Sequence, residues 1–202
     1  ITLSAEVCPE IREYDRMSTA CANAYVQPMI AGYLNRLQGG LLLGGITCPL
    51  LLMMSSGGVT TVDTAVRLPI RLVESGPAGG AILAREIAKE NDLRKALSFD
   101  MGGTTAKITL IDDFQPQIGR SFEVARMSRF LKGSGLPLRI PAIEMVEIGA
   151  GGGSIAAVDS MRRIHVGPES AGSVPGPACY GNGGTAATVT DADTGLGRID
   201  PS

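Results

Sequence analysis

Residues Asp100 to Thr105 combine types and spacing that suit phosphate and metal chemistry. Asp100 ends an apolar run, and Met101-Gly102-Gly103-Thr104-Thr105 follows it directly. Adjacent glycines expose backbone N–H groups, threonine hydroxyls add donors, and a carboxylate can hold a divalent cation. A β-rich run over 108–111 leaves the turn, so the pattern predicts a β-hairpin. Two interpretations stay open here, a phosphate-binding hairpin and an ordinary hairpin with a glycine turn.

The position of Lys107 excludes one common phosphate loop. In a P-loop the glycine segment opens a helix and ends in Gly-Lys-Ser/Thr. Here Lys107 follows the threonines, and the turn leads into a β-branched strand. The arrangement is instead typical of the phosphate hairpin in ATPases of the actin, sugar kinase and Hsp70 class.

A second glycine segment, Gly149-Ala150-Gly151-Gly152-Gly153-Ser154, nearly matches the dinucleotide fingerprint G-x-G-x-x-G/A. A Rossmann site requires this fingerprint to open a long helix. The residues that follow predict another hairpin instead, with strands over 155–158 and 164–166. The context therefore argues against a Rossmann site.

A third glycine-rich turn stands between an expected strand over 70–73 and an expected helix over 81–89. Ser75 is the expected N-cap of this helix, with Pro77 in its first turn. A helix N-terminus is a ready anion site. A close-packed corner would need the same glycines, so both interpretations stay open.

The remaining patterns predict a mixed α/β chain. The region 9–38 predicts a helix that bends at Pro28. An apolar stripe at i, i+4 spacing, expected to pack inward, comprises Tyr25, Met29, Tyr33 and Leu37. Further expected elements are a strand over 49–54, a helix over 62–67, a strand-like run over 140–148, and a short strand over 188–190 that leads to Asp191. The segments 112–135 and 167–184 are expected to be irregular.

Composition narrows the class of protein. The 202 residues are 44% hydrophobic, enough for a core in one large domain or two small ones. The net charge of −2, without a basic patch, argues against nucleic acid or anionic membrane partners. The cysteines lack C-x-x-C spacing and His165 is the only histidine, so no zinc site or Cys-His dyad is indicated. Neither a signal sequence nor a paired cysteine framework is recognisable, so a cytoplasmic protein is expected.

With these segments in place, the sequence resembles the hydantoinase A/5-oxoprolinase family. The motifs run in family order across nearly the whole chain: Leu3-Ser4, Arg16–Thr19 through Ala24-Tyr25, Ser75–Gly80, Phe99–Thr105, Ile148–Ala156, Gly167–Gly172, Pro175–Gly181 and Thr190–Ala192. Such a collinear series is more specific than any single glycine loop.

The resemblance implies an ATP-dependent hydrolase that phosphorylates an amide oxygen and opens a hydantoin, 5-oxoproline or similar lactam. It also implies an α/β fold of two actin-like, RNase H-like lobes that bind ATP and Mg²⁺, each with one Asp-containing hairpin. Only one such hairpin is present, so the chain is expected to be a central fragment. Residues 1–95 would end the first lobe and residues 96–202 would begin the second. Expected partners are the remainder of the polypeptide and a hydantoinase B-type subunit or domain, and the isolated fragment is expected to be inactive.

The resemblance also implies site residues. Asp100 is expected to hold Mg²⁺ and to act in catalysis. Asp191 is a second catalytic candidate, although a capped turn explains it equally well. The residues expected to contact the cofactor are Gly102, Gly103, Thr104, Thr105, Lys107, Gly151, Gly152, Gly153 and Ser154. Lys107 stands where the family often has an acid, so a phosphate contact and a solvent-facing position both stay open.

Two other functions stay open. An ATP-dependent ketone carboxylase would share the lobes and differ in what attacks the phosphorylated intermediate. A non-catalytic ATP-binding regulator would share the fold alone, because fold does not fix chemistry.

Overall fold

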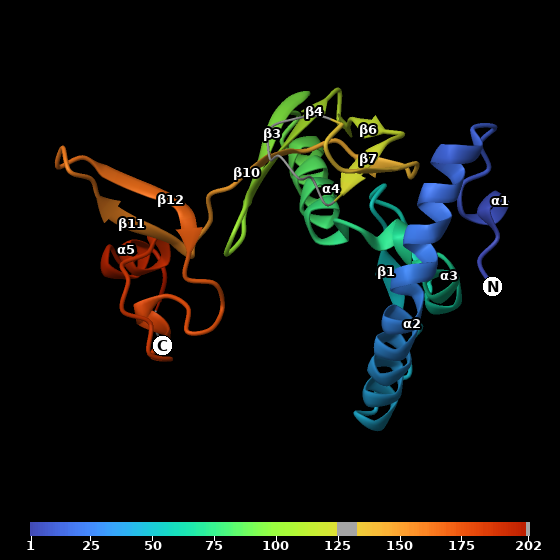
Figure 1. Ribbon diagram of the computed structural model, residues 1–202, viewed down its shortest axis with the longest axis horizontal. Coiled ribbons are helices and arrows are strands. Elements are labelled where there is room, and N and C mark those ends of the chain that lie inside the picture. Colours follow the sequence, from blue (N-terminus) through green and yellow to red (C-terminus); the bar gives the residue numbers. More distant parts are fainter. Residues whose placement is uncertain (125–132, 201–202) are drawn as a thin grey trace. The chain divides into compact units, whose positions relative to one another are not determined.

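The computed structural model describes residues 1–124 and 133–200, a mixed α/β structure (Figure 1). It divides into two compact units, one of Ile1–Ala96 with Leu110–Glu144 and one of Leu97–Thr109 with Met145–Ser202. Strands β3 (Lys95–Met101) and β4 (Ala106–Asp112) contribute residues to both. The assignment of 1–95 and 96–202 to two lobes stays a prediction, because a compact unit need not coincide with a lobe.

The first unit is built on the long helix α2 (Glu13–Leu43). Its other elements are α1 (Ser4–Val7), β1 (Leu51–Met53), β2 (Val59–Thr61), α3 (Val62–Arg67), the 3₁₀ helix η1 (Pro69–Leu72), α4 (Ser75–Glu90), β5 (Gln115–Pro116), β6 (Ile118–Gly119), β7 (Phe122–Val124), β8 (Leu136–Leu138) and β9 (Ala142–Ile143). The strands pair antiparallel as β1–β2, β4–β5, β6–β9 and β7–β8. The core has two apolar clusters, around Leu34, Val62 and Ala65 and around Val7, Ile70, Leu138 and Ile140.

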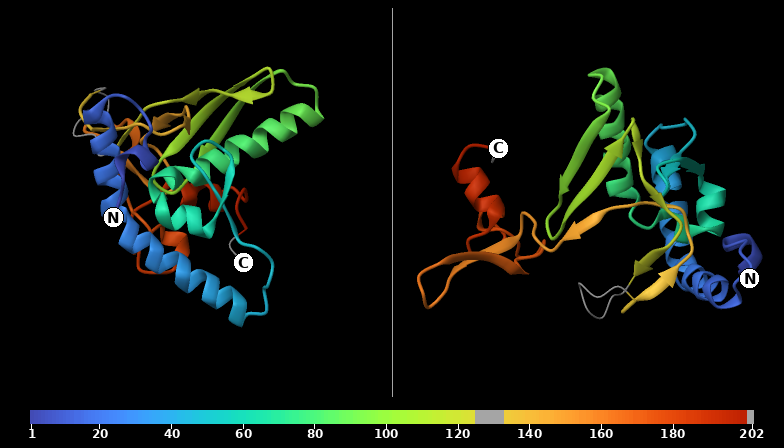
Figure 2. Two further views of the ribbon diagram at one scale, coloured as in Figure 1. Left: turned by 90° about the vertical axis from the view of Figure 1, so that its right-hand side faces the viewer. Right: turned by 90° about the horizontal axis from the view of Figure 1, so that it is seen from above.

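Helix α2 continues through Pro28 without a break (Figure 2). The prediction that the stripe packs inward is confirmed for Leu37, which is half-buried against the cluster around Leu34. It is wrong for Tyr25, Met29 and Tyr33, whose side chains are 87%, 69% and 53% exposed. The buried face is a different one and includes Asn23 and Leu34. Periodicity alone does not decide which of two helix faces is buried. Here the hydrogen bonds of the Asn23 side chain hold its face of α2 inward.

Asn23 joins α2 to the turn between α3 and η1. Its Nδ2 donates to the Arg67 carbonyl at 3.0 Å, and its Oδ1 accepts from the Ile70 amide at 3.2 Å. The side chain is fully buried. Burial removes these backbone groups from water, and the two hydrogen bonds to Asn23 satisfy them instead.

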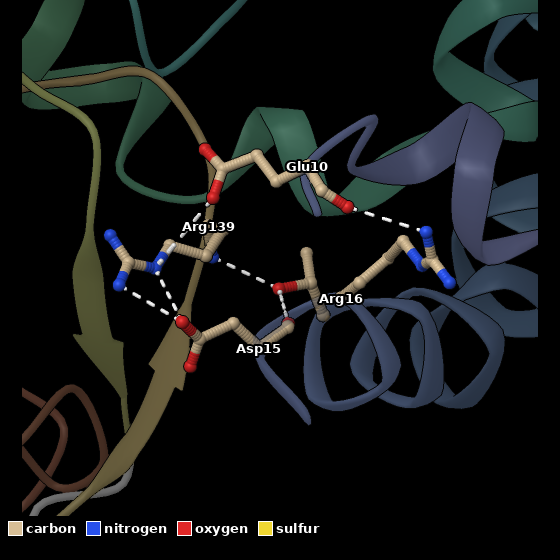
Figure 3. Close-up of polar contacts among 5 residues, drawn as sticks. Glu10, Asp15, Arg16 and Arg139 are labelled. Atoms are coloured by element: carbon tan, nitrogen blue, oxygen red, sulfur yellow. Dashed lines mark hydrogen bonds and ion pairs between the residues drawn. The ribbon is translucent and has the colours of Figure 1, made fainter. Parts of the chain in front are cut away.

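The N-terminal turns of α2 are held by an ion pair and a shared hydroxyl (Figure 3). Arg139, after β8, donates from Nε and Nη2 to one Asp15 oxygen at 3.1 and 2.9 Å. The Thr19 hydroxyl donates to the Asp15 carbonyl at 2.7 Å and accepts from the Arg139 amide at 2.9 Å. These contacts hold Arg139, which is distant in the sequence, against the N-terminal turns of α2.

Several predicted elements of this unit are confirmed and others are wrong. The helix over 62–67 is confirmed, and β1 lies within the strand predicted over 49–54. The predicted strand over 70–73 is wrong, since the 3₁₀ helix η1 ends there and the Ser55 hydroxyl binds the Arg71 and Val73 carbonyls.

Three further corrections concern turns and short strands. The N-cap of α4 is Glu74 in the left-handed conformation, rather than Ser75. The segment 112–135, predicted to be irregular, contains the short strands β5, β6 and β7; its residues 125–132 lie outside the described residues. The strand-like run over 140–148 is two strands, β9 and β10 (Val146–Ile148), which pair with different partners. A sequence pattern shows β preference but not the partner that ends each short strand.

The second unit contains residues of three strands of a four-stranded sheet, in which β5 also pairs with β4, and a separate ribbon. The sheet has the order β10–β4–β3, with Val146 opposite Ile108 and Ile148 opposite Ala106. The ribbon joins β11 (Ser154–Val158) and β12 (Ile164–Ser170) antiparallel, which confirms the predicted hairpin (Figure 2). The 3₁₀ helix η2 (Ala178–Tyr180) and α5 (Val189–Gly195) follow.

The predicted strand over 188–190 is wrong, because Thr188 is the N-cap of α5. The Thr188 hydroxyl accepts from the Asp191 amide at 3.3 Å, and an Asp191 oxygen accepts from the Thr188 amide at 2.8 Å. This reciprocal capping box satisfies donors that a helix start leaves open, and it outweighs the β preference of the threonines and valine.

Asp191 also binds the loop that contains η2. Its Oδ1 accepts from the Cys179 amide at 2.7 Å, and its Oδ2 accepts from the Ala178 amide at 3.3 Å. Desolvation raises the pKa of Asp191, but hydrogen bonds from Cys179 and Thr188 outweigh it and hold that pKa well below its usual range. The carboxylate therefore stabilises this unit in its ionised form.

Among residues 1–124 and 133–200, no helix combines the length and the apolar character needed to cross a membrane.

The buried position of Asn23 predicts a large cost for its removal. Asn23→Ala leaves the Arg67 carbonyl and the Ile70 amide without partners, so the free energy of unfolding should fall by about 1–3 kcal/mol. Asn35→Ala, at an exposed position of the same helix, should change it by about 0.5 kcal/mol or less. Urea unfolding of the two variants makes the comparison. Equal values would show that the Asn23 hydrogen bonds do not anchor α2.

The depressed pKa of Asp191 predicts a pH-dependent contribution to stability. Asp191→Asn should lower the free energy of unfolding by about 1–2 kcal/mol near neutral pH, because a neutral amide replaces the carboxylate that accepts from the Ala178, Cys179 and Thr188 amides. The difference should be complete above about pH 4, the pKa of an unfolded aspartate, and shrink as the pH falls toward the lower native pKa. Thermal unfolding between pH 7 and pH 2 measures it. Asp193→Asn, which removes only an ion pair to the exposed Arg198, is the control and should show a smaller difference.

Candidate functional site

The predicted hairpin around Asp100 is confirmed, with β3 and β4 as its strands. The Gly102 amide donates to the Thr105 carbonyl at 2.9 Å and closes the turn. Asp100 lies near the end of β3, and its side chain is exposed. No described residue forms a hydrogen bond or an ion pair with its carboxylate. The carboxylate is thus accessible to a ligand beside the turn.

The second glycine segment lies directly against this turn. The Gly152 amide donates to the Gly102 carbonyl at 2.9 Å, and the Gly153 amide donates to the Gly103 carbonyl at 2.7 Å. Two groups of predicted site residues, distant in sequence, are therefore brought together. Because the segment leads into the β11–β12 hairpin and not into a helix, the structure excludes a Rossmann site here.

Two amides of the turn have no partner within the described chain. No described residue accepts a hydrogen bond from the amide of Gly103 or of Thr104. Both residues are exposed, so these donors face solvent. Consecutive N–H groups in a turn form a concave donor site for anions. The turn therefore offers an anion two donors next to the Asp100 carboxylate.

Close backbone approach explains the glycines of the second segment. A Cβ on Gly151 would lie 2.6 Å from the Gly103 carbonyl carbon and from the Thr104 amide nitrogen. A Cβ on Gly153 would lie 2.9 Å from the Gly103 carbonyl oxygen. Ser154 is buried, and its hydroxyl accepts from the Gly151 amide at 2.9 Å. Gly151 and Gly153 thus lie against the turn through their backbone, and Ser154 holds Gly151 in place.

Lys107 lies on β4 directly opposite Glu147 on β10. Lys107 is half-buried, whereas Glu147 is exposed. Residues directly opposite each other on paired strands project from the same face of the sheet, and both interpretations of Lys107 stay open. Sequence reasoning placed Glu147 on a strand but did not connect it with Lys107, because register between distant strands has no local signal.

The structure favours the capping interpretation of Asp191. Both of its oxygens accept hydrogen bonds from Ala178, Cys179 or Thr188. Its low pKa makes it a weak proton acceptor, which argues against general-base catalysis. Thr190, which sequence reasoning missed, is closer to the glycine segment, since its amide donates to the Gly152 carbonyl at 2.8 Å.

Metal binding here would depend on few protein ligands. Within the described ranges 1–124 and 133–200, no group of three or more His, Cys, Asp or Glu side chains could hold a metal ion. A shallow groove of about 360 Å³ lies at the far end of the hairpin, lined by Lys95, Asp112 and their neighbours. It is remote from the turn along both strands and offers no converging acids.

Comparison with known proteins places this site in a family context. The profile described as hydantoinase/oxoprolinase matches residues 16–202. The chain is 34% identical over 202 residues to a 5-oxoprolinase of Saccharomyces cerevisiae, covering 100% of this chain and 15% of that protein. It is 36% identical over 194 residues to the caprolactamase alpha subunit of Pseudomonas jessenii, covering 96% of this chain and 27% of that protein.

Two solved structures are similar. Nucleotide-free acetone carboxylase, from work on ATP-dependent acetone carboxylation, matches with a TM-score of 0.76 and 26% identity over 98% of this chain and 26% of its own. The ATP-dependent caprolactamase of Pseudomonas jessenii matches with a TM-score of 0.66 and 35% identity over 98% and 27%. The chain spans less than a third of these relatives. The match over residues 16–202 shows that the chain belongs to the hydantoinase/oxoprolinase family.

Proposed function

We propose that this chain is the phosphate-holding part of an ATP-dependent enzyme that opens a cyclic amide. The observation that carries the proposal is the β3–β4 turn, where the amides of Gly103 and Thr104 have no partner among the described residues and closely follow the exposed Asp100 in the sequence. Family membership and the ATP-dependent caprolactamase relative support the assignment of ATP as the anion.

The residues present fit Mg-ATP. Mg²⁺ is usually held by one or two carboxylates together with substrate phosphates, and it keeps several waters. Asp100 would supply the carboxylate, while the amides of Gly103 and Thr104 would bind phosphate oxygens. The lack of a cage of three acids in the described chain is consistent with such a site. Lys107, on β4, would add positive charge near the phosphates.

The chemistry requires little more of this part of the protein than positioning. A lactam amide is a poor electrophile, and phosphorylation of its oxygen would make the carbonyl carbon open to addition of water. Departure of the ring nitrogen with a proton would then break the C–N bond and leave an acyl phosphate, which a second water would hydrolyse to carboxylate and phosphate. Phosphoryl transfer depends mainly on alignment and on neutralised charge. Fixed amide donors would align the phosphate, and the cation held by Asp100 would neutralise its charge, without either group taking part in covalent bonds.

The rest of the enzyme would lie outside these 202 residues. Relatives share 15–27% of their length with the chain, so the lactam pocket and the catalytic water site need further segments. We assign the chain to two actin-like lobes, with a further Asp-containing hairpin and a hydantoinase B-type partner completing the active site in the cytoplasm.

Ketone carboxylation is the second candidate function. Acetone carboxylase gives the higher TM-score of the two solved structures, 0.76 against 0.66. The same phosphate site would serve both reactions, because they differ in the acceptor and the attacking group. The substrate therefore has to be found by assay.

Loss of the Asp100 carboxylate should abolish turnover. In the full-length polypeptide with its partner, Asp100→Asn should lower ATP hydrolysis by about 100-fold or more, because it removes the metal-binding charge. The unfolding temperature should stay nearly unchanged, since no described residue contacts this carboxylate. Asp112→Asn, at the exposed far end of β4, is the matched control and should remain active. Near-normal hydrolysis by Asp100→Asn would disprove the assignment.

Phosphate release distinguishes the candidate reactions. We expect ATP hydrolysis by the complete enzyme to be stimulated by 5-oxoproline, a hydantoin or caprolactam. Stimulation only by ketones with bicarbonate would replace the hydrolase with a carboxylase. Release that no substrate stimulates would indicate a non-catalytic ATP-binding module.

A further inference from the structure

We propose that the glycine segment Gly151–Gly153 binds no ligand itself and instead positions the phosphate-binding amides of the β3–β4 turn. The inference rests on the proposed function, because it assigns the parts of that site different roles. The three glycines, expected from the sequence to contact the cofactor, would instead position the residues that do.

Peptide planarity connects the two segments. In a trans peptide the C=O of one residue and the N–H of the next point in opposite directions. The Gly102 and Gly103 carbonyls point toward the segment, where the Gly152 and Gly153 amides bind them at 2.9 and 2.7 Å. The N–H groups of Gly103 and Thr104 must therefore point away from it. The two hydrogen bonds from Gly152 and Gly153 to the turn therefore fix the direction of the Gly103 and Thr104 N–H groups on its opposite side.

The segment is itself held from its other side. The Gly152 carbonyl accepts from the Thr190 amide at 2.8 Å, and the Gly153 carbonyl accepts from the Ala171 amide at 2.8 Å. The segment thus links the turn to the start of α5 and to the loop after β12. A backbone engaged on both sides has no N–H at Gly152 or Gly153 left for phosphate.

Steric fit gives the proposal a specific test. A Cβ on Gly152 would lie 2.5 Å from the Thr190 hydroxyl oxygen but 3.9 Å from the Thr190 Cβ. The only severe clash is thus with a single side-chain atom. No described residue forms a hydrogen bond with that hydroxyl. Thr190→Ala should therefore remove the obstacle at little cost.

The experiment compares Gly152→Ala, Thr190→Ala and the double variant. Gly152→Ala should displace the segment, shift the NMR amide signals of Gly103 and Thr104, and raise the KM for ATP about tenfold, the cost of about one misaligned hydrogen bond to a charged group. Thr190→Ala should resemble the natural protein, and the double variant should restore both the signals and the KM. Gly195→Ala, with nothing within 4 Å of the added Cβ, is the control and should change neither.

The outcomes separate this inference from the proposed function. Amide shifts that appear in Gly152→Ala and disappear in the double variant support the positioning role, even if the enzyme hydrolyses no ATP. Unchanged Gly103 and Thr104 signals in Gly152→Ala, or no restoration in the double variant, would overturn it. If Gly152→Ala fails to fold, hydrogen exchange in the unaltered chain decides. Slow exchange at Gly152 and Gly153 with fast exchange at Gly103 and Thr104 supports the proposal, and the reverse order contradicts it.

Discussion

The candidate site depends on backbone pairing between two glycine segments. The segment that donates from Gly152 and Gly153 to the Gly102 and Gly103 carbonyls approaches so closely that a Cβ on Gly151 or Gly153 would clash with the backbone of the turn. These two glycines are required for closeness rather than for flexibility. The pairing also determines which atoms of the turn remain available, since the carbonyls are used internally and the next two amides are not. A rigid donor array loses little entropy when an anion binds.

Two aspartates of the second unit show how surroundings assign roles to one residue type. Asp191 accepts hydrogen bonds from Ala178, Cys179 and Thr188, and they lower its pKa and satisfy its oxygens. Asp100 is exposed and has no such partner among the described residues. A carboxylate with occupied oxygens holds a loop, whereas one with open oxygens can hold a cation. In the sequence each is an acid near two threonines, so the sequence does not distinguish their roles.

Features with a local cause were predictable from the sequence. The β3–β4 and β11–β12 hairpins have turn residues between β-rich runs, and α3 has a threonine N-cap, so each pattern determines its own structure. The failures involve partners distant in the chain. The region 70–73 has strand composition, but carbonyl contacts with Ser55 accompany a 3₁₀ turn. The buried face of α2 follows Asn23, whose partners lie more than 40 residues away. The pairing of the two glycine segments is equally non-local, and their shared composition suggested two binding loops rather than one loop and its support.

A phosphate site that does not depend on the substrate would explain why relatives with different chemistry share this part of their structure. A lactamase and a ketone carboxylase both align with nearly the whole chain, although they cover only about a quarter of their own length with it. In the function proposed above, the chain would contribute fixed amides and one carboxylate, which would recognise a phosphate and its cation independently of the acceptor. Differences between amide opening and carboxylation would then arise after the phosphate is positioned and would require changes elsewhere in the polypeptide. The glycine pairing can then stay constant while the substrate changes, because its geometry is set by backbone contacts and not by the molecule that is phosphorylated.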